Sequence, residues 1–568
     1  MRKYSWGEEL SRKRSWFLGV CLMLGLAVLG DPAVGVAQQV AEQSEATPPR
    51  PVALFNVAAI DRVLADVDYV FAAAGRPEFS DFVGSLLANV RDFAGIDRKK
   101  PLGLMVFVDP SVDLKPVPVG YLPVEDMNKL IKTFSAATLT IKRAEKAGDY
   151  EVIGPRGILQ MRQVGGYAFI AEERETLQQD LPNPAGLTGS LTSNYDLAAM
   201  VDLRDMPDAL RTVFAQGLRT SAEEQLRQRE KESDEQYRFR RASAESVLEV
   251  LEMAVEDGQV LTVGFRASPQ ARTAVLEADL RVKSDSGFSE YLQRIAGRRS
   301  QFENLLQAEV PFTFSTSWSL GQQGRASFTE LINMLERRIS AELGGTPADK
   351  SPVTQLADIF RRTARDGHLD FFIQMRRYDP GLFVLLGGMK VTDGQKVAQA
   401  LARILQKIDE RSELAELQLN ALSYQGVTVH RVRGQRVSRR DQRLYGEKPS
   451  LYVGGGGRTL WFAVGGANAV SALRVAIDQA RQDTRNSAGG SGIPFRLTVN
   501  MTDWVQNANP EQPFGRIGRQ AFQPDADALR IELQPTDDGA RLRVEFEEGF
   551  LRLVGLLLTQ RLEQRLQF

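Results

Sequence analysis

One order of strands and helices occurs twice along this chain of 568 residues, the second time about 260 residues after the first. Each copy opens with a short apolar strand that starts at a proline, Pro51 or Pro311, and continues into an amphipathic helix. A repeated order of elements is typical of a duplicated structural unit. We therefore expect two related halves, residues 51–300 and residues 311–568.

Later landmarks support the same alignment. An apolar strand ends in Asp-Pro at Asp109 in the first half and at Asp379 in the second, and Asp-Pro favours a turn because proline fixes φ while Asp bonds nearby amides. A Gly-Phe pair follows the last hairpin of each half, at Gly287 and Gly549, and restores the spacing to about 260. The alternative is a coincidence among common elements.

Strand pairs and helices alternate within each half. Glycines separate the strands of two of the predicted hairpins, at 165–166 and 454–457, where turns favour residues that tolerate positive φ. The sequence predicts the α+β class, with two duplicated halves that each contain a mainly antiparallel, hairpin-built sheet covered by helices.

The first 37 residues are typical of an export signal. A basic cluster at 12–14 precedes an apolar run at 16–29, and small residues follow up to Ala37. The run of about 14 residues is shorter than the roughly 20 that a membrane-spanning helix needs. We expect a cleaved signal peptide at 1–37, a flexible leader at 38–50, and a mature protein in the periplasm, at the cell surface or outside the cell; a retained anchor is the alternative.

Residue usage excludes several kinds of chemistry. Cys21 is the only cysteine and lies inside the predicted signal, and His368 and His430 are the only histidines. Disulfides, thiolate catalysis and Cys/His zinc sites are therefore excluded from the mature chain. The formal net charge of −1 argues against global attraction to nucleic acid or to an anionic membrane. We expect no cofactor and no metal.

No catalytic motif appears. Both histidines are expected at strand edges on the surface, and neither is expected to be essential. The glycines at 454–457 lead into a strand, whereas a dinucleotide fingerprint leads into a helix. Two catalytic carboxylates can come from distant positions. Asp61, Asp66 and Asp68 cluster near the first helix, and we interpret them as an acidic, solvated face.

Two insertions interrupt the repeat. Residues 205–256 are rich in helix formers of both charges, which predicts a long helical arm that projects from the first half, either as a solvated extension or as a partner-binding arm. Residues 409–450 contain an arginine-rich stretch, expected to be a loop between strands. Arginine suits phosphate, sulfate and carboxylate groups, so candidate polyanion-binding residues are Arg431, Arg433, Arg436, Arg439, Arg440 and Arg443.

The leading hypothesis is an exported, non-catalytic protein with a binding or structural role. A carboxylate-dependent glycan hydrolase and a polyanion-binding protein are the alternatives. Expected partners are an envelope protein or an anionic polymer, with no nucleic acid and no transmembrane helix in the mature chain. The order of elements and the export signal resemble those of exported bacterial proteins of similar length and unknown function, a resemblance that implies no site residue.

Overall fold

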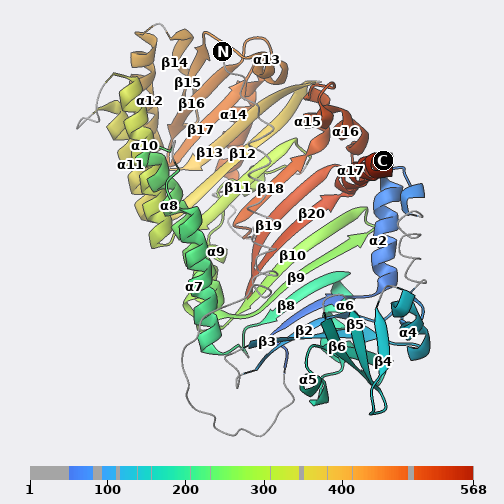
Figure 1. Ribbon diagram of the computed structural model, residues 1–568. Coiled ribbons are helices and arrows are strands. Elements are labelled where there is room, and N and C mark those ends of the chain that lie inside the picture. Colours follow the sequence, from blue (N-terminus) through green and yellow to red (C-terminus); the bar gives the residue numbers. More distant parts are fainter. Residues whose placement is uncertain are drawn as a thin grey trace.

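A computed structural model describes residues 50–80, 93–109, 115–136, 139–154, 157–204, 206–229, 232–307, 309–344, 351–379, 381–411, 413–483 and 492–566 (Figure 1). It has the mixed helix and antiparallel-sheet architecture of the α+β class. The predicted signal peptide and, except for Arg50, the predicted leader lie outside these residues. The segment 79–95, whose sequence pattern predicts a second helix in the first half, also lies mostly outside them.

The first ten described strands pair in the spatial order β4-β5-β6-β7-β3-β2-β1-β8-β9-β10, and every pair is antiparallel. Their bounds are β1 Ala53–Val57, β2 Leu102–Asp109, β3 Lys115–Pro123, β4 Thr140–Arg143, β5 Asp149–Gly154, β6 Gly157–Val164, β7 Tyr167–Ala171, β8 Leu197–Asp202, β9 Gly258–Ser268 and β10 Thr273–Val282.

The next ten strands pair in the order β14-β15-β16-β17-β13-β12-β11-β18-β19-β20, again antiparallel throughout. Adding ten to each label of the first series gives the second. The bounds are β11 Phe312–Ser319, β12 His368–Asp379, β13 Leu382–Lys390, β14 Leu414–Tyr424, β15 Val427–Gly434, β16 Ser450–Gly456, β17 Thr459–Gly465, β18 Phe495–Asn500, β19 Ala528–Thr536 and β20 Gly539–Glu547.

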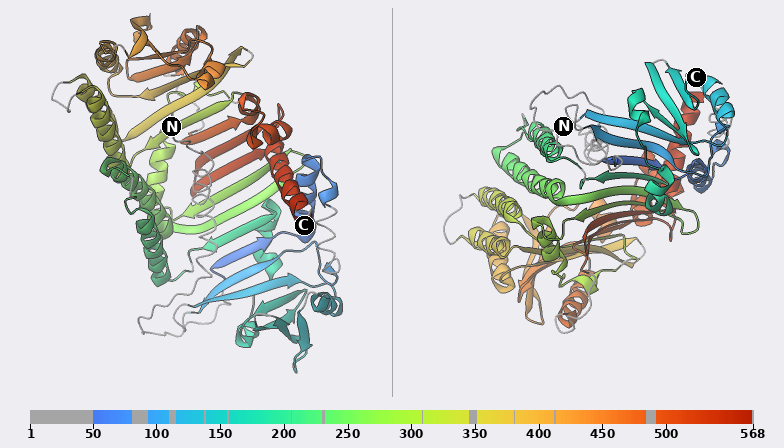
Figure 2. Two further views of the ribbon diagram at one scale, coloured as in Figure 1. Left: turned by 45° about the horizontal axis from the view of Figure 1, so that its top comes forward. Right: turned by 90° about the horizontal axis from the view of Figure 1, so that it is seen from below.

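The two series form one continuous sheet, because β10 pairs with β20 (Figure 2). This antiparallel pairing runs from Thr273 opposite Glu547 to Arg281 opposite Gly539. Nine residue pairs join these two strands, one more than the eight pairs of the hairpin between β19 and β20. The last strand of each series therefore lies at the centre of the sheet.

Alternate side chains of each strand point to opposite faces of the sheet. We call the face that carries Phe265, Leu276 and Leu542 the front face, and the face that carries Glu277 and Arg543 the back face. The registers of β9, β10 and β20 place each of these sets on one side.

Helices cover both faces, but over different strands. Front-face apolar side chains pack with α2 (Ile60–Ala73), α4 (Met127–Ala136), α9 (Gly287–Ala296), α11 (Pro352–Asp366), α12 (Gly394–Asp409) and α17 (Glu548–Leu566). Back-face side chains of the outer strands pack with α5 (Arg174–Gln178), α6 (Pro184–Asn194), α14 (Asn468–Asp483) and a short 3-10 turn at Glu303–Leu305. The cores are consequently concentrated toward the two ends of the sheet.

Local sequence explains where the helices begin and end. The Ser351 side chain accepts a hydrogen bond from Thr354 N at the start of α11, and Pro352 occupies the first turn. Gly367 ends the same helix with φ of +68°, a conformation that glycine adopts without strain. The Asp393 side chain caps α12 by accepting from Lys396 N.

The helical insertion does not project from the first half. It folds into α7 (Asp208–Gln225) and α8 (Asp234–Asp257), and α8 packs against α10 (Gln322–Glu342) of the second series. Ser327 Oγ donates to Ala242 O at 2.6 Å across this contact. Helix α17 packs in turn against α2 of the first series. Each series therefore contributes helices that contact the other.

Of the glycines at 454–457, which the sequence places in a hairpin turn, only Gly457 lies in the turn between β16 and β17, with φ of +55°, and the other three are paired residues of β16. Helices α15 (Met501–Asn507) and α16 (Pro513–Ala521) follow β18 and pack with α17. None of the helices described is both long enough and apolar enough to cross a bilayer.

Candidate functional site

Ion pairs cross the back face of the four central strands. They link β18 to β19, β19 to β20, and β20 to β10 at N–O distances of 2.9 to 3.3 Å: Arg496–Glu532, Arg530–Glu545, Arg541–Asp279 and Arg543–Glu277. Opposite charges directly across a strand pair stabilise a sheet. These arginines and acids are matched to each other, so the back face offers little uncompensated charge to a ligand.

The front face of the same region is apolar. We define the central apolar face by nine side chains that point forward from β9, β10, β18, β19 and β20: Leu261, Val263, Phe265, Leu276, Ala278, Leu497, Ile531, Leu533 and Leu542. All nine are only half-buried. With strand spacing of about 4.8 Å, five strands span roughly 20 Å.

At the centre of β10, burial on the two faces is opposite to the usual preference. Glu277 is 8% exposed, whereas its neighbours Leu276 and Ala278 on the front face are half-buried. The Tyr195 hydroxyl donates to Glu277 Oε2 at 3.2 Å, and the Tyr195 ring lies against Gly264, where a Cβ would be 2.3 Å from it. Acids are normally the exposed residues and leucines the buried ones. Apolar surface is therefore left available on the front.

Helices border the central apolar face on two sides (Figure 1). Leu280 and Ala540, at one end of the central strands, pack with α9. The Phe550 ring of α17 lies 5.9 Å from the Phe546 ring at the other end. By contrast, Leu276 and Leu542 between these ends belong to none of the described core clusters. Helices thus cover the ends of the strands and leave the middle.

A buried polar cluster surrounds His368. Its Nε2 lies 2.9 Å from Ser317 Oγ, and its Nδ1 lies 3.2 Å from Lys390 Nζ. Ser317 Oγ donates to Arg298 O, so the neutral ring donates from Nε2 and accepts at Nδ1. Burial and the charges of Lys390 and Arg298 lower the pKa of His368 to about 4. A serine nucleophile needs the opposite tautomer, with an acid on Nδ1.

Asp370 holds the connection between the two series in place. It is fully buried and accepts from Ser300 Oγ at 2.7 Å and from Gln301 N at 2.9 Å. Burial raises the pKa of Asp370 to about 6, while the bonds from Gln301 and Ser300 and the charge of Lys390 lower it. The cluster therefore fixes the 298–302 segment on the second series.

The expectation that both histidines lie on the surface is wrong. His368 is 7% exposed and His430 is 1% exposed. His430 Nδ1 accepts from Asn420 N at 3.1 Å, and its Nε2 bonds Ala398 O at 2.9 Å. A polar ring with both nitrogens bonded is tolerated in a core. Alternation within β15 predicted a strand but not which of its faces is covered.

The three acids near the first helix have separate surroundings. Asp61 pairs with Arg98 at 2.7 Å, and Asp68 accepts from Ser80. Burial and the nearby charge of Asp196 raise the pKa of Asp66 to about 7, and Arg62 lowers it.

Asp196 itself is committed to structure. Its carboxylate pairs with Arg62 at 2.5 Å and accepts from Ala267 N at 3.0 Å. A hydrolase of the two-carboxylate type needs a second acid able to exchange protons or attack. Besides burial, it is the charge of Asp196 that raises the pKa of Asp66, and the Asp196 carboxylate is already bonded to Arg62 and Ala267 N.

The arginine-rich stretch is not a single loop. Residues up to 434 belong to β15, and 439–445 form the short helix α13 (Arg439–Tyr445). Arg431 and Arg433 both pair with Glu416, at 3.1 and 3.0 Å. The other four candidates are exposed: Arg436, Arg439, Arg440 and Arg443. The candidate set therefore divides into two neutralised and four exposed arginines.

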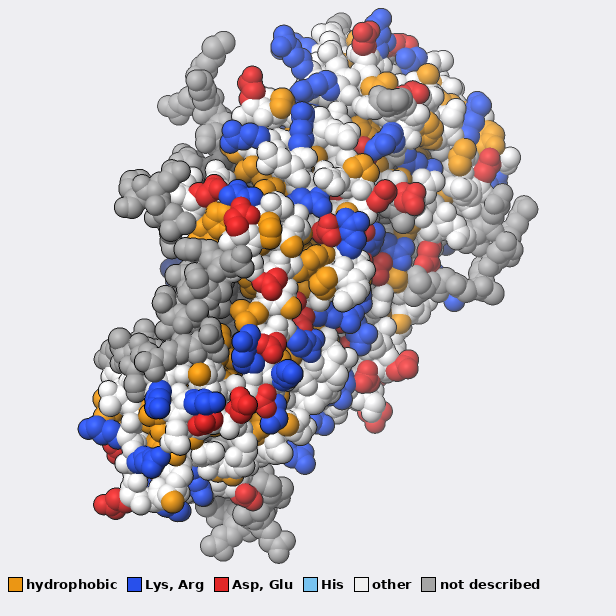
Figure 3. All heavy atoms as spheres, turned by 90° about the vertical axis from the view of Figure 1, so that its right-hand side faces the viewer, with side chains coloured by type: hydrophobic (Ala, Val, Ile, Leu, Met, Phe, Trp, Pro, Cys, Tyr) orange, Lys and Arg blue, Asp and Glu red, His pale blue; other side chains and the backbone are white. Residues whose placement is uncertain are grey.

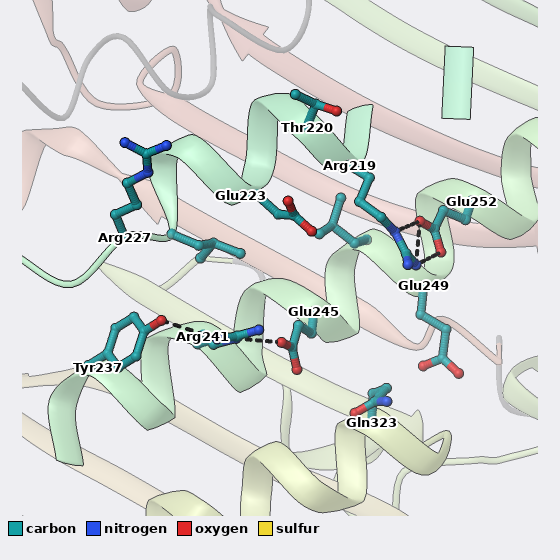
Figure 4. A pocket seen from close by; sticks show the side chains of 12 residues that line it. Arg219, Thr220, Glu223, Arg227, Tyr237, Arg241, Glu245, Glu249, Glu252 and Gln323 are labelled. Carbon is teal, nitrogen blue, oxygen red and sulfur yellow. Dashed lines mark hydrogen bonds and ion pairs between the residues drawn. The ribbon is translucent and has the colours of Figure 1, made fainter. Parts of the chain in front are cut away.

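A polar cleft of about 880 Å³ lies between α7, α8 and the start of α10 (Figure 4). Arg219 and Glu252 form a two-bonded ion pair across it, and Arg241 bonds both Glu245 and Tyr237. These pairs bridge or line the cleft with matched charges. The sequence does not predict this cleft, because the cleft depends on how α7, α8 and α10 pack against one another.

Within the described residues, no three His, Cys, Asp or Glu side chains are grouped so that they could hold a metal ion. The central apolar face, the polar cleft and the exposed arginines are three features of the described residues that a ligand could use. Comparison of the chain with models of protein families, with curated proteins and with solved structures finds no match.

Proposed function

We propose that this chain is an exported, non-catalytic binding protein that holds a long apolar molecule against the central apolar face. The observation that carries the proposal is the inverted burial on β10, where Glu277 is buried and Leu276 is not. Contact with hydrocarbon contributes about 25 cal/mol per Å² of apolar surface removed from water. A ligand that covered the face would gain this free energy, because the folded chain leaves these side chains partly exposed to water.

An acyl chain fits this face better than a peptide does. The middle of a sheet face presents side chains, since the backbone groups of β9, β10, β19 and β20 already pair with neighbouring strands. An extended peptide laid on it would bury amide groups without partners, at a cost of a few kcal/mol each. A methylene chain has no such groups.

A second copy of the chain is also a poor fit. Helices stand along both sides of the face, α8 and α9 on one and α17 and α2 on the other (Figure 1). Two identical surfaces facing each other would bring helix against helix before their sheets met. A slender ligand can enter between the helices.

We further propose that the two series of strands arose by duplication. The support is that β1 to β10 and β11 to β20 pair in the same order, and that the last strand of each forms the junction. Export remains part of the proposal and is supported by the sequence of the first 37 residues.

Binding of cis-parinaric acid, a fluorescent long-chain fatty acid, tests the proposal on the chain from Gln38 onward. We expect a saturable rise in fluorescence that palmitate reverses. Leu542→Glu should weaken binding by at least about tenfold, because it places a charge in the contact. Val475→Glu is the matched control, since Val475 is 46% exposed on the back-face helix α14. Absence of saturable binding, or equal loss in both variants, would refute it.

A polyanion-binding surface is a second candidate, favoured by the four exposed arginines at and before α13. Dextran sulfate should bind more weakly as salt rises, because exposed charges are screened. Replacing Arg439 and Arg440 with Gln should abolish the salt-dependent part, whereas Arg433→Gln, at a residue already paired with Glu416, should not. Equal effects of both changes would exclude α13 as the site.

A further inference from the structure

Apolar side chains lie on several sides of helix α17, and neighbouring elements cover only some of these sides. Phe550, Leu553 and Leu556 pack with α16 and with the end of the sheet. On a second side, Arg552 Nε donates to Ala73 O of α2 at 2.8 Å, and a Cβ at Gly555 would lie 2.6 Å from Val70 O. A helix that is apolar all round is normally buried all round.

A third side of α17 is open. Val554, Leu557 and Leu558 are 46%, 42% and 41% exposed. Their spacing of three and four residues places them on one side of the helix, and Arg561 follows on the same side one turn later. On the adjoining helix α16, Phe514 is 51% exposed. The helices α16 and α17 together expose four large apolar side chains.

Positive charge accompanies these apolar side chains. Arg516, Arg519 and Arg561 are exposed, and no described acid forms an ion pair with any of them. The Arg519 guanidinium bonds carbonyl groups at the end of α15 and keeps its charge. Acids on α17 are already paired, Glu548 with Arg272 and Arg552 and Glu563 with Arg76. Two exposed acids at the ends of α16, Glu511 and Asp525, form no ion pair among the described residues.

Figure 3 views the molecule from the side on which α16 and α17 lie, and hydrophobic side chains gather near the middle of that view with Lys and Arg side chains, and also Asp and Glu side chains, beside them. Leucine and phenylalanine next to arginine are the combination that binds the interface of an anionic bilayer, with apolar groups among the acyl chains and guanidinium groups at the phosphates.

We propose that the exposed sides of α16 and α17 dock this protein on an anionic lipid bilayer. The inference goes beyond the proposed function, since it concerns where the protein binds and not what it holds. Helix α17 begins directly after β20, the strand that carries Leu542 of the central apolar face. A bilayer in contact with α17 would therefore lie next to that face.

A bilayer suits this patch better than a second copy of the chain. Three aliphatic side chains and one ring provide far less surface than the about 800 Å² per partner that a stable protein interface buries. The flanking arginines would also face the same arginines across a two-fold axis, which like charges disfavour. Lipid phosphates neutralise them instead.

Co-sedimentation with vesicles tests the proposal on the chain from Gln38 onward. Vesicles of phosphatidylcholine alone are compared with vesicles of phosphatidylcholine and phosphatidylglycerol in equal amounts. We expect binding to the anionic vesicles, weakened by salt. Replacing Leu557 and Leu558 with Ser should lower the partition coefficient by about tenfold or more. Arg561→Gln should lower it roughly fivefold, and only for anionic vesicles.

A matched control exists on a strand. Ile158 and Leu159 are adjacent and are 55% and 40% exposed on β6, so replacing both with Ser removes similar apolar surface elsewhere and should leave vesicle binding unchanged. Circular dichroism and thermal unfolding check that each variant folds. The proposal is overturned if the parent chain does not bind anionic vesicles, or if both double variants lose binding equally.

Two further measurements separate the alternatives. If the parent is a dimer in solution and the Leu557/Leu558 variant is a monomer, the patch is an interface between copies and the bilayer proposal fails. Parinaric acid binding by the same variant should be retained, whereas Leu542→Glu should lose parinaric acid and keep vesicles. These measurements can therefore refute the membrane-docking proposal and the ligand-binding proposal independently.

Discussion

Arg543 Nη1 lies 3.3 Å from Oε1 of Glu277, across the strand pair through which the two series become one sheet. Their register is the middle one of the nine that join β10 to β20. Glu277 is 8% exposed and also accepts from Tyr195. The junction between the two series thus has at its centre a hydrogen-bonded ion pair between the buried Glu277 and the half-buried Arg543.

Glu277→Gln should lower the free energy of unfolding by about 1 kcal/mol, because it weakens the bond from the buried Glu277 to Arg543, which is half-buried and keeps its second partner, Glu545, at 2.8 Å. Urea unfolding followed by circular dichroism measures this. Glu290→Gln is the control: Glu290 is 74% exposed and pairs loosely with Arg294 at 3.7 Å, so its loss should change stability by less than about 0.5 kcal/mol. Equal effects would show that the junction pair is unimportant.

Acid should destabilise the protein through His368. Its pKa is lowered to about 4 in the folded chain from 6.5, so the unfolded chain takes up the proton first as pH falls. The stability contributed by the neutral ring is present above pH 6.5 and is lost as pH falls toward 4. The loss amounts to about 3 kcal/mol at most.

Asp370 should act in the opposite direction. Its pKa is raised to about 6 from 3.8, so its contribution is present below pH 3.8 and is lost as pH rises through 6. The two effects offset each other between pH 4 and 6. Urea unfolding over this range should show Asp370→Asn losing stability with acid more steeply than the parent and His368→Gln less steeply. Unchanged slopes would contradict this account of the cluster.

The two histidines should matter for stability and not for ligand binding. Replacing His430 with Gln removes a ring whose nitrogens bond Asn420 N and Ala398 O inside the core, so we expect a loss of about 1 to 3 kcal/mol. Parinaric acid affinity of the His368→Gln and His430→Gln double variant, measured below its unfolding temperature, should match the parent. Loss of parinaric acid binding in a variant that still folds would contradict the prediction that the histidines take no part in binding.

Asp66→Asn should stabilise the protein in mild base. The pKa of Asp66 is raised to about 7 from 3.8 by burial and by Asp196, so its stabilising contribution is present below pH 3.8 and lost as pH rises through 7. The amide side chain of the Asp66→Asn variant does not ionise, so the variant does not lose this stability as pH rises. Thermal unfolding should show a higher midpoint for the variant at pH 8 and little difference at pH 4; the reverse order would contradict the assignment.

The exported chain should begin at Gln38 or within a few residues of it, because small residues precede that position. Intact-mass spectrometry of protein recovered outside the cytoplasm measures the new terminus. A full-length chain retained in the membrane fraction would show that the apolar run at 16–29 serves as an anchor.

Local patterns predicted the order of elements well. The glycines at 454–457 indicated the β16–β17 hairpin, and alternating apolar residues indicated strands such as β10. Pairing between distant strands has no such local signal. Nothing in the segment 273–282 specifies Glu547 to Gly539 as its partner, because every residue of a strand offers the same backbone groups.

The site was harder to predict than the fold. Alternation in β10 separates Leu276 from Glu277, but it does not say which of the two faces a neighbouring chain segment covers. The usual assumption is that the apolar face is covered, and here Tyr195 lies over the charged one. The sequence does not show that Arg431 and Arg433 are neutralised, because their pairing with Glu416 depends on the register of β14 and β15.

The pairing of β10 with β20 also bears on how such a chain could have originated. Either series alone would end in a strand of nine or ten residues with one row of amide and carbonyl groups unpaired, and exposed edges of this length promote aggregation. Two identical single-series chains could cover both edges at once by joining them antiparallel about a two-fold axis. On the duplication that we propose, the ancestor was a homodimer, and gene fusion made permanent an association that each subunit already needed to remain soluble.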